Sequence, residues 1–325
     1  NGQRVTSNVY EIDGVSVNSL TWGGAAVVTP NSESVQDMTI VANSYSAVDG
    51  RNSGAHIKVT SKSGSDEFHG SGVFRFQDPN FNAYNKWGGP NNAPAVRVDT
   101  KYRQYGGSIG GPIKKDKLFF FFSYEGLTNH SQSYGQNWVL TPQFRQQVTE
   151  ARPNSILAKI CQTSNVTPRI LAVLNNDCSA FASQPQTQCR AVDGGLDIGS
   201  LQAPLGPGNP YVANTFNGGG LDNIPDLQYV EYYSPTTQQG NQYNGRVDYQ
   251  LTSKDLIAGS VYFTNLDQTS ADAASASMPS ADVPFKPLNS AITGIYIHTF
   301  SPVVLNELRS NFTRFADNQV TIGRA

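Results

Sequence analysis

Apolar and polar residues alternate with a period of two in several stretches of this chain, each about as long as one β-strand. Successive side chains of a strand point to opposite faces, so this alternation predicts a sheet with one apolar and one polar face. Three pairs of stretches are joined by short turns, at residues 114–117, 252–255 and 301–303. The expected strands, seven in all, are 68–76, 104–113, 118–125, 242–251, 256–264, 292–300 and 304–315.

The strand at 118–125 begins with the residues LFFFF. On a water-soluble sheet such a segment would favour aggregation. If it faces lipid instead, Phe120 and Phe122 meet an apolar solvent, and Tyr124 can lie at the level of the headgroups. The strands are close to the ~9–11 residues that cross a bilayer at a slant. The pattern therefore predicts transmembrane hairpins, with a soluble sheet that has one solvated face as the alternative.

The polar faces of two later strands carry ionised residues two positions apart. Arg246 precedes Asp248 in one strand, and Glu307 precedes Arg309 in another. Charged side chains destabilise the lipid face of a barrel, whereas the interior is polar. We therefore expect Arg246, Asp248, Glu307 and Arg309 to face the lumen of an outer-membrane barrel.

Composition narrows the class of protein. The 325 residues include 30 Gly, 15 Tyr and 16 Phe, with only 15% charged residues, and the mean hydropathy is −0.39. No apolar run approaches the ~18 residues of a transmembrane helix, which excludes a helical membrane protein. A formal charge of −2 argues against nucleic acid as a partner, and the basic cluster at 114–117 is more simply a solvated turn.

The cysteines and histidines indicate no catalytic or metal site. Cys161, Cys178 and Cys189 all fall between residues 127 and 241. In an oxidising compartment a Cys178–Cys189 disulfide would close the shortest loop and leave one thiol over. The four histidines are dispersed, without metal-ligand spacing, and no Gly-x-Ser-x-Gly nucleophile motif occurs. We expect neither an enzyme nor a cofactor.

Residues 1–66 have a different pattern, with short strands and Gly-rich turns. Asp13-Gly14 between two apolar segments predicts a hairpin with a two-residue turn. Asn31 or Ser32 is suited to cap one helical turn before a strand at 37–41, and another strand fits 55–60. These features predict a small α+β domain.

Several short motifs, in order along the chain, resemble a known family. In the first region they are 1–4 (NGQR), 10–15 (YEIDGV), 30–36 (PNSESVQ), 45–47 (YSA), 50–55 (GRNSGA) and 60–64 (TSKSG). In the second they are 69–71 (HGS), 108–117 (SIGGPIKKDK) and 124–126 (YEG). The first set resembles the plug of a TonB-dependent outer-membrane transporter, and the second resembles the start of its barrel. The most similar subgroup is the Oar-like receptors.

The resemblance implies a fold and a location. Residues 1–66 would be the C-terminal part of the plug, and 67–325 the N-terminal part of the barrel, with a long extracellular loop at 127–241. Such a barrel has about 22 strands around a plugged lumen, so seven strands would belong to a receptor about three times as long. The chain opens on Asn1 with no signal peptide or TonB box, and we expect it to be an internal piece.

The resemblance also implies a function in the Gram-negative outer membrane. Outer-membrane lipid would surround the barrel, and TonB, ExbB and ExbD would energise uptake through a TonB box outside this sequence. The solute would be an iron chelate, a vitamin-like cofactor, an oligosaccharide or a peptide. The short turns would face the periplasm and the long connections the exterior. The loop around Trp138 is a candidate for ligand contact, or else a surface shield.

Two other classes of protein stay open from the sequence. One is a barrel that acts as an adhesin or surface receptor and binds without importing. The other is a secreted, soluble β-rich binding protein.

Overall fold

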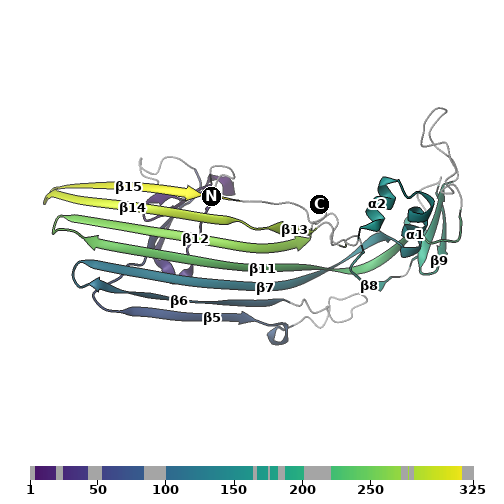
Figure 1. Cartoon of the computed structure of the whole chain (residues 1–325), viewed down its shortest axis with the longest axis horizontal. Helices are drawn as coiled ribbons and strands as arrows, with labels where there is room; N and C mark the ends of the chain where they lie inside the picture. Colours follow the sequence, from purple (N-terminus) through teal and green to yellow (C-terminus); the bar gives the residue numbers. More distant parts are fainter. Residues whose placement is uncertain are drawn as a thin grey trace, which may run out of the picture. The chain divides into compact units, whose positions relative to one another are not determined.

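The computed structural model describes residues 4–19, 25–42, 53–83, 100–163, 167–174, 176–181, 187–200, 221–271, 277 and 282–316. The motif 45–47, residues 1–3 of the motif NGQR and residues 50–52 of the motif GRNSGA lie outside these residues. The described residues are mostly strand (Figure 1). Among them, no helix is long and apolar enough to cross a membrane.

Seven long strands form one antiparallel sheet, in which neighbours along the chain are neighbours in space (Figure 1). The short turns at 115–117, 251–254 and 302–303 all lie at the same end of this sheet. All seven predicted strands are confirmed. They are β5 (His69–Gln77), β6 (Lys101–Lys114), β7 (Leu118–Leu140), β11 (Leu227–Gln250), β12 (Asp255–Ala271), β14 (Leu288–Ser301) and β15 (Val304–Arg314).

The two faces of the sheet differ as the alternation predicts. Phe122 is 44% exposed, whereas its neighbour Ser123 is fully buried. Across four adjacent strands, the exposed face carries a row of rings with neighbouring centroids 5.1–6.3 Å apart: Tyr105, Tyr124, Tyr243 and Phe263. Tyr at one level of an apolar face is typical of the aromatic girdle where a barrel meets the membrane interface.

Several strands are longer than predicted, and the largest differences are in β7, β11 and β12. β12 continues to Ala271, where we expected its end at residue 264. β7 has 23 residues and continues to Leu140, where we expected its end at residue 125. β11 has 24 residues and begins at Leu227, where we expected a start at residue 242. The predicted loop 127–241 is therefore wrong at both ends, and the connection between the strands is 141–226. Beyond the bilayer neither face needs to be apolar, so the ladder continues without the alternation that revealed the rest.

The N-terminal region forms a separate four-stranded sheet in the order β2-β1-β4-β3. β1 (Val9–Ile12) pairs antiparallel with β2 (Val15–Ser16) and parallel with β4 (His56–Ser61), and β4 pairs antiparallel with β3 (Val35–Val41). The predicted hairpin turn is confirmed, with φ of 52° at Asp13 and 74° at Gly14. Two single-turn helices, η1 (Val5–Ser7) and η2 (Ser32–Ser34), complete it, and Asn31 caps η2 as predicted.

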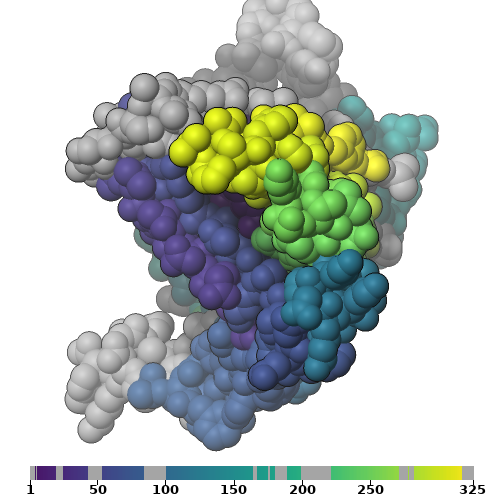
Figure 2. Space-filling view, turned by 90° about the vertical axis from the view of Figure 1, so that its left-hand side faces the viewer, coloured from purple at the N-terminus to yellow at the C-terminus, as the bar shows by residue number. Residues whose placement is uncertain are grey.

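This small domain packs on the buried face of the large sheet. Figure 2, viewed from the end that carries the short turns, shows the sheet curving around the purple N-terminal residues. One core cluster joins the two: Ile12, Val17, Val27 and Val28 of the small domain, with Tyr262 of β12 and Ala291 of β14. The domain therefore shares its core with the wall of the large sheet.

Residues 132–236 and 269–284 form a second compact unit. It contains the helices α1 (Pro142–Ala151) and α2 (Ile156–Gln162) and the hairpin of β9 (Thr187–Val192) with β10 (Gly195–Ser200). The remaining short elements of the described residues are β8 (Ile170–Val173), η7 (Cys178–Phe181), η4 (Pro79–Phe81) and β13 (Asp282–Phe285).

Candidate functional site

A buried ionic cluster joins the small domain to the large sheet. Arg246 of β11 directs Nη1 to Asp13 Oδ1 at 3.3 Å and to Ser61 Oγ at 2.8 Å. Its Nη2 donates to Asp248 Oδ1 at 2.8 Å, and its Nε donates to Asp248 Oδ2 at 3.0 Å. The guanidinium therefore bridges a carboxylate of its own strand and one of the small domain. We call Asp13, Ser61, Arg246 and Asp248 the ionic latch.

The local fold of the small domain places Asp13 in this latch. Asp13 occupies the first position of the two-residue hairpin turn, where φ is positive and Asp is tolerated. Its Oδ1 accepts from Ser61 N at 2.9 Å, and its Oδ2 accepts from Ser61 Oγ at 2.7 Å and Ser260 Oγ at 3.4 Å. Only 4% of the Asp13 side chain is exposed. A buried carboxylate needs such partners, because its desolvation is otherwise costly.

Further polar contacts hold other edges of the small domain to the sheet. Ser123 Oγ of β7 donates to Asn31 Oδ1 at 3.2 Å and accepts from Asn244 Nδ2 at 3.4 Å. Ser71 Oγ of β5 donates to the carboxylate of Glu33. Asn311 Nδ2 of β15 donates to the carbonyl of Ser16 at 2.9 Å. Strands from both ends of the sheet thus contact the same domain.

The second predicted ion pair is more exposed. Arg309 Nε donates to Glu307 Oε1 at 2.6 Å, and the two side chains are 39% and 29% exposed. The Arg309 guanidinium lies directly over Gly14, where an added Cβ would come within 1.4 Å of Nη1. Position 14 therefore requires glycine for two reasons: its φ is positive, and the arginine leaves no room for a Cβ atom.

Sequence reasoning found the charged residues of the sheet but missed their partners. Arg246, Asp248, Glu307 and Arg309 all lie on the face that carries the small domain. Asp13 was predicted as a turn residue and Asn31 as a helix cap, but neither they nor Ser61 and Ser123 were predicted to join the two parts of the chain. The only local signal was the Asp13-Gly14 turn, which predicts a hairpin but not a charge partner 233 residues away.

Trp138 lies in β7, so the expectation that it belongs to a loop is wrong. Its indole packs against Tyr229 of β11, with ring centroids 5.0 Å apart. The Tyr229 hydroxyl donates to Gln136 Oε1 at 3.2 Å. This environment supports cross-strand packing for Trp138, as in other paired aromatic residues of sheets.

Cys178 and Cys189 form a disulfide that ties η7 to β9, and Cys161 is free. In the same unit, the Asp226 carboxylate accepts from Ile198 N at 2.7 Å. Burial raises the pKa of Asp226 above its ordinary value, the Ile198 hydrogen bond opposes this, and the negative charges of Asp197 and Asp222 add to it. Within the described ranges, no three His, Cys, Asp or Glu side chains are placed to hold a metal ion.

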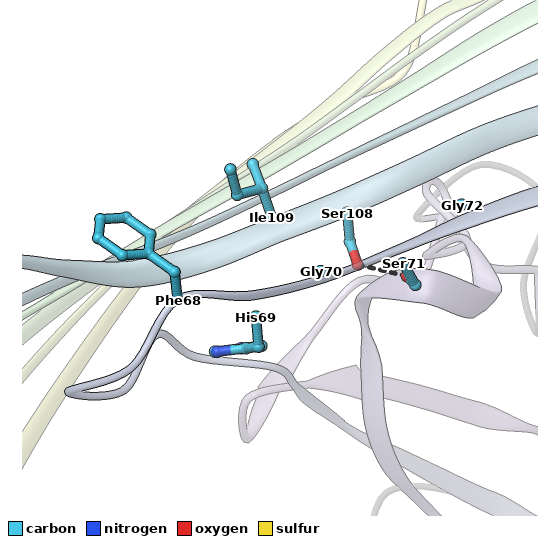
Figure 3. Close-up of a pocket in the computed structure, with 7 residues that line it drawn as sticks. All are labelled: Phe68, His69, Gly70, Ser71, Gly72, Ser108 and Ile109. Atoms are coloured by element: carbon cyan, nitrogen blue, oxygen red, sulfur yellow. Dashed lines mark hydrogen bonds between the residues drawn. The ribbon is translucent and has the colours of Figure 1, made fainter.

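A hollow along β5 is explained by the edge of the sheet. Figure 3 shows Phe68 and Ile109 pointing to one side of the strands and His69 to the other. The hydroxyls of Ser71 and Ser108 are 2.7 Å apart and hydrogen-bonded (Figure 3). Among the described strands, β5 is an end strand, and such an edge presents unpaired backbone groups. The hollow therefore needs no ligand to account for it.

The chain is similar to a known transporter in sequence and to a solved structure in outline. The TonB-dependent transporter Oar of Myxococcus xanthus is 34% identical over 128 residues, which cover 38% of this chain and 12% of that protein. The resemblance to Oar-like TonB-dependent receptors is confirmed by this relative, of whose length this chain spans only 12%. The siderophore receptor PiuA from Acinetobacter baumannii, a solved structure, has a TM-score of 0.32 and 9% identity, covering 97% of this chain and 38% of that one.

The most extensive match is to a family model described as an outer membrane beta barrel domain, over residues 60–324. This range takes in all seven long strands. Together with one apolar and one polar face of the sheet, it places the protein in the outer membrane of a Gram-negative cell. The chain belongs to the family of outer-membrane β-barrel domains.

Proposed function

We propose that this chain supplies part of the plug and part of the barrel wall of a TonB-dependent outer-membrane transporter. The small domain is the plug, and the face of the sheet that it covers is the lumen, so that Arg246, Asp248, Glu307 and Arg309 face the lumen. The observation that carries the proposal is the ionic latch, which holds a separate domain against the wall by contacts that can be broken and remade.

Uptake needs energy in this proposal. A wide barrel sealed by a plug passes solute only when the plug moves, and the outer membrane has no energy source of its own. TonB, ExbB and ExbD would supply the force through the TonB box of the transporter. The solute would be one that porins do not pass, such as an iron chelate, a cofactor, an oligosaccharide or a peptide. The short turns would face the periplasm, and the long connections between hairpins the exterior.

A reversible tether between plug and wall tests this proposal. Asn31 and Ser123 are in contact, so the double variant Asn31→Cys/Ser123→Cys brings two thiols together across the interface. The variant would be expressed from the native gene in its own host, and uptake would be followed for the nutrient whose use is lost on deletion of that gene. Oxidation should stop uptake without reducing binding to cells, and a reductant should restore it. Each single-cysteine variant is a matched control.

The same experiment separates a transporter from a receptor that only binds. An adhesin or surface receptor would bind its ligand equally well in the oxidised and reduced states and would never import it. Import should also stop in a host that lacks TonB. Import that persists in the oxidised tether, or without TonB, would overturn the proposal.

A further inference from the structure

A polar cluster lies on the exposed face of the large sheet, at the end that carries the short turns. Asp255 begins β12 directly after the turn 251–254, and its register partner on β14 is His298. The side chains of Asp255 and His298 are 16% and 26% exposed. Strand alternation places them on the same face as Ile257 and Phe300, which are both exposed. A polar pair therefore lies at the edge of a face that is largely apolar.

Three donors hold the carboxylate of Asp255. His298 Nδ1 lies 2.6 Å from Asp255 Oδ1, and Tyr296 Oη donates to the same oxygen at 2.8 Å. The hydroxyl of Thr252 donates to Asp255 Oδ2. Because a carboxylate oxygen can only accept, the proton of the first contact is carried by Nδ1. Asp255 thus fixes both the orientation of the His298 ring and its tautomer.

The other nitrogen of the His298 ring points to no partner within the described part of the chain. With the proton on Nδ1, Nε2 of the neutral ring is a hydrogen-bond acceptor, and no described residue donates to it. The exposed Lys254 likewise makes no ion pair with a described residue. Its carbonyl accepts from Thr299 N at 2.9 Å, which places it beside the residue that follows His298. One acceptor and one cation are therefore available at the same end of the sheet.

The surroundings of this surface limit the ligand. The exposed face of an outer-membrane barrel meets lipid, and the edges of its apolar band meet lipid headgroups. A matching headgroup offers an N–H donor to Nε2 and an anion to Lys254. Phosphatidylethanolamine has both, whereas the quaternary ammonium of phosphatidylcholine has no N–H group. Phosphatidylglycerol brings a net negative charge to a site where Asp255 already balances Lys254, so the zwitterion is the better match.

We propose that Asp255, His298 and Lys254 form a binding site for the headgroup of phosphatidylethanolamine. The lipid ammonium donates to His298 Nε2 and is attracted by the Asp255 carboxylate, and the lipid phosphate pairs with Lys254. The ring of Phe300, whose centroid is 4.3 Å from that of His298, packs against the acyl chains. The inference rests on the assignment of the exposed face to lipid. It does not depend on uptake, and a barrel that only binds its ligand would carry the same site.

Native mass spectrometry of the native polypeptide, purified in detergent, tests the headgroup. The protein is offered phosphatidylethanolamine, phosphatidylcholine and phosphatidylglycerol in equal amounts and with identical acyl chains. Phosphatidylethanolamine should bind roughly fivefold more tightly than phosphatidylcholine, the effect of one neutral hydrogen bond, and more tightly than phosphatidylglycerol. Equal binding of the three lipids, or a preference for either of the other two, would overturn the proposed ligand.

Two substitutions separate the roles of the ammonium and the phosphate. His298→Phe keeps an aromatic ring beside Phe300 but removes Nε2, so it should abolish the preference for phosphatidylethanolamine over phosphatidylcholine. Lys254→Gln, in an exposed turn, should weaken both lipids equally, because both carry a phosphate.

His130→Phe is the matched control for the histidine. His130 lies in β7 on the face of Phe122, far along the strand from the turn, and is exposed. This variant should keep the preference of the wild type. The site is refuted if His298→Phe retains the preference, if His130→Phe loses it as well, or if Lys254→Gln weakens neither lipid.

Discussion

Removing the charge of Arg246 should loosen the small domain from the sheet. Arg246→Met keeps much of the length of the side chain and removes every hydrogen bond of the guanidinium. It leaves Asp13 and Asp248, which are 4% and 11% exposed, without their shared cation. The energetic question is therefore what two buried carboxylates cost when the charge between them is gone.

The magnitude follows from the burial of the latch. Breaking a buried ion pair by removing one partner typically costs ~3–5 kcal/mol. Asp13 keeps two hydrogen bonds from Ser61, and Arg246 is 18% exposed, so the lower limit, ~3 kcal/mol, applies here. Asp13→Asn should cost only ~1 kcal/mol, because Arg246 still pairs with Asp248. The double variant should cost less than the sum, with a coupling of roughly 1–2 kcal/mol.

Native-state hydrogen exchange on the purified protein measures this cost. The free energy of opening is read from the backbone amides of β1 and β4, which belong to the small domain. Arg309→Met is the matched control, since it makes the same change on the same face at a more exposed pair, where ~0–1 kcal/mol is expected. An Arg246→Met effect within about 0.5 kcal/mol of wild type, or strict additivity with Asp13→Asn, would refute the reasoning.

Two further predictions concern the membrane face and the unit at 132–236. Phe122→Lys should lower the free energy of unfolding by ~2–4 kcal/mol if the face that carries Phe122 meets the bilayer midplane, whereas Ser108→Lys should be tolerated. A folding assay in lipid vesicles measures both. Equal effects of the two variants would contradict the assignment of Phe122 to the lipid face. Asp226→Asn should raise the thermal stability of that unit at pH 8 relative to wild type. A raised folded-state pKa means that the carboxyl destabilises the fold once it ionises, so the advantage should vanish as the pH falls below the ordinary Asp value of ~3.9. A gain of equal size at pH 8 and pH 3.5 would argue against an ionisation effect.

The membrane part of the fold could be predicted because lipid imposes a strict pattern. Where one face meets lipid and the other a polar interior, the sequence must alternate, and 242–251 (QYNGRVDYQL) does so clearly. From residue 128 to 140, β7 reads TNHSQSYGQNWVL, which has no apolar face. The hydrogen bonds of the ladder require no side-chain pattern, so the extension of β7 and β11 carried no signal.

The candidate site was only partly predictable, for a related reason. Charged residues on a transmembrane strand stand out, and Arg246 and Asp248 were found in this way. Their partner Asp13 sits in a turn where Asp is common for local reasons alone. Asn244 is on the same polar face, but it is only 4% exposed and is bonded to Ser123, so its polarity does not mean that it faces water. Polarity identified the face but not the domain that covers it.

The composition of the interface bears on whether the small domain can move. Its apolar part is one cluster centred on Ile12, Val17 and Tyr262, and most of the remaining contacts are hydrogen bonds and ion pairs. Apolar contacts lose their stabilisation on separation, whereas polar groups recover hydrogen bonds from water, so a polar contact contributes little net free energy. Such an interface specifies one docked position for the small domain but lets the domain separate from the sheet reversibly. In the transporter proposed above, a plug must seal the lumen at rest and yield to a mechanical pull, and this combination of contacts would allow both.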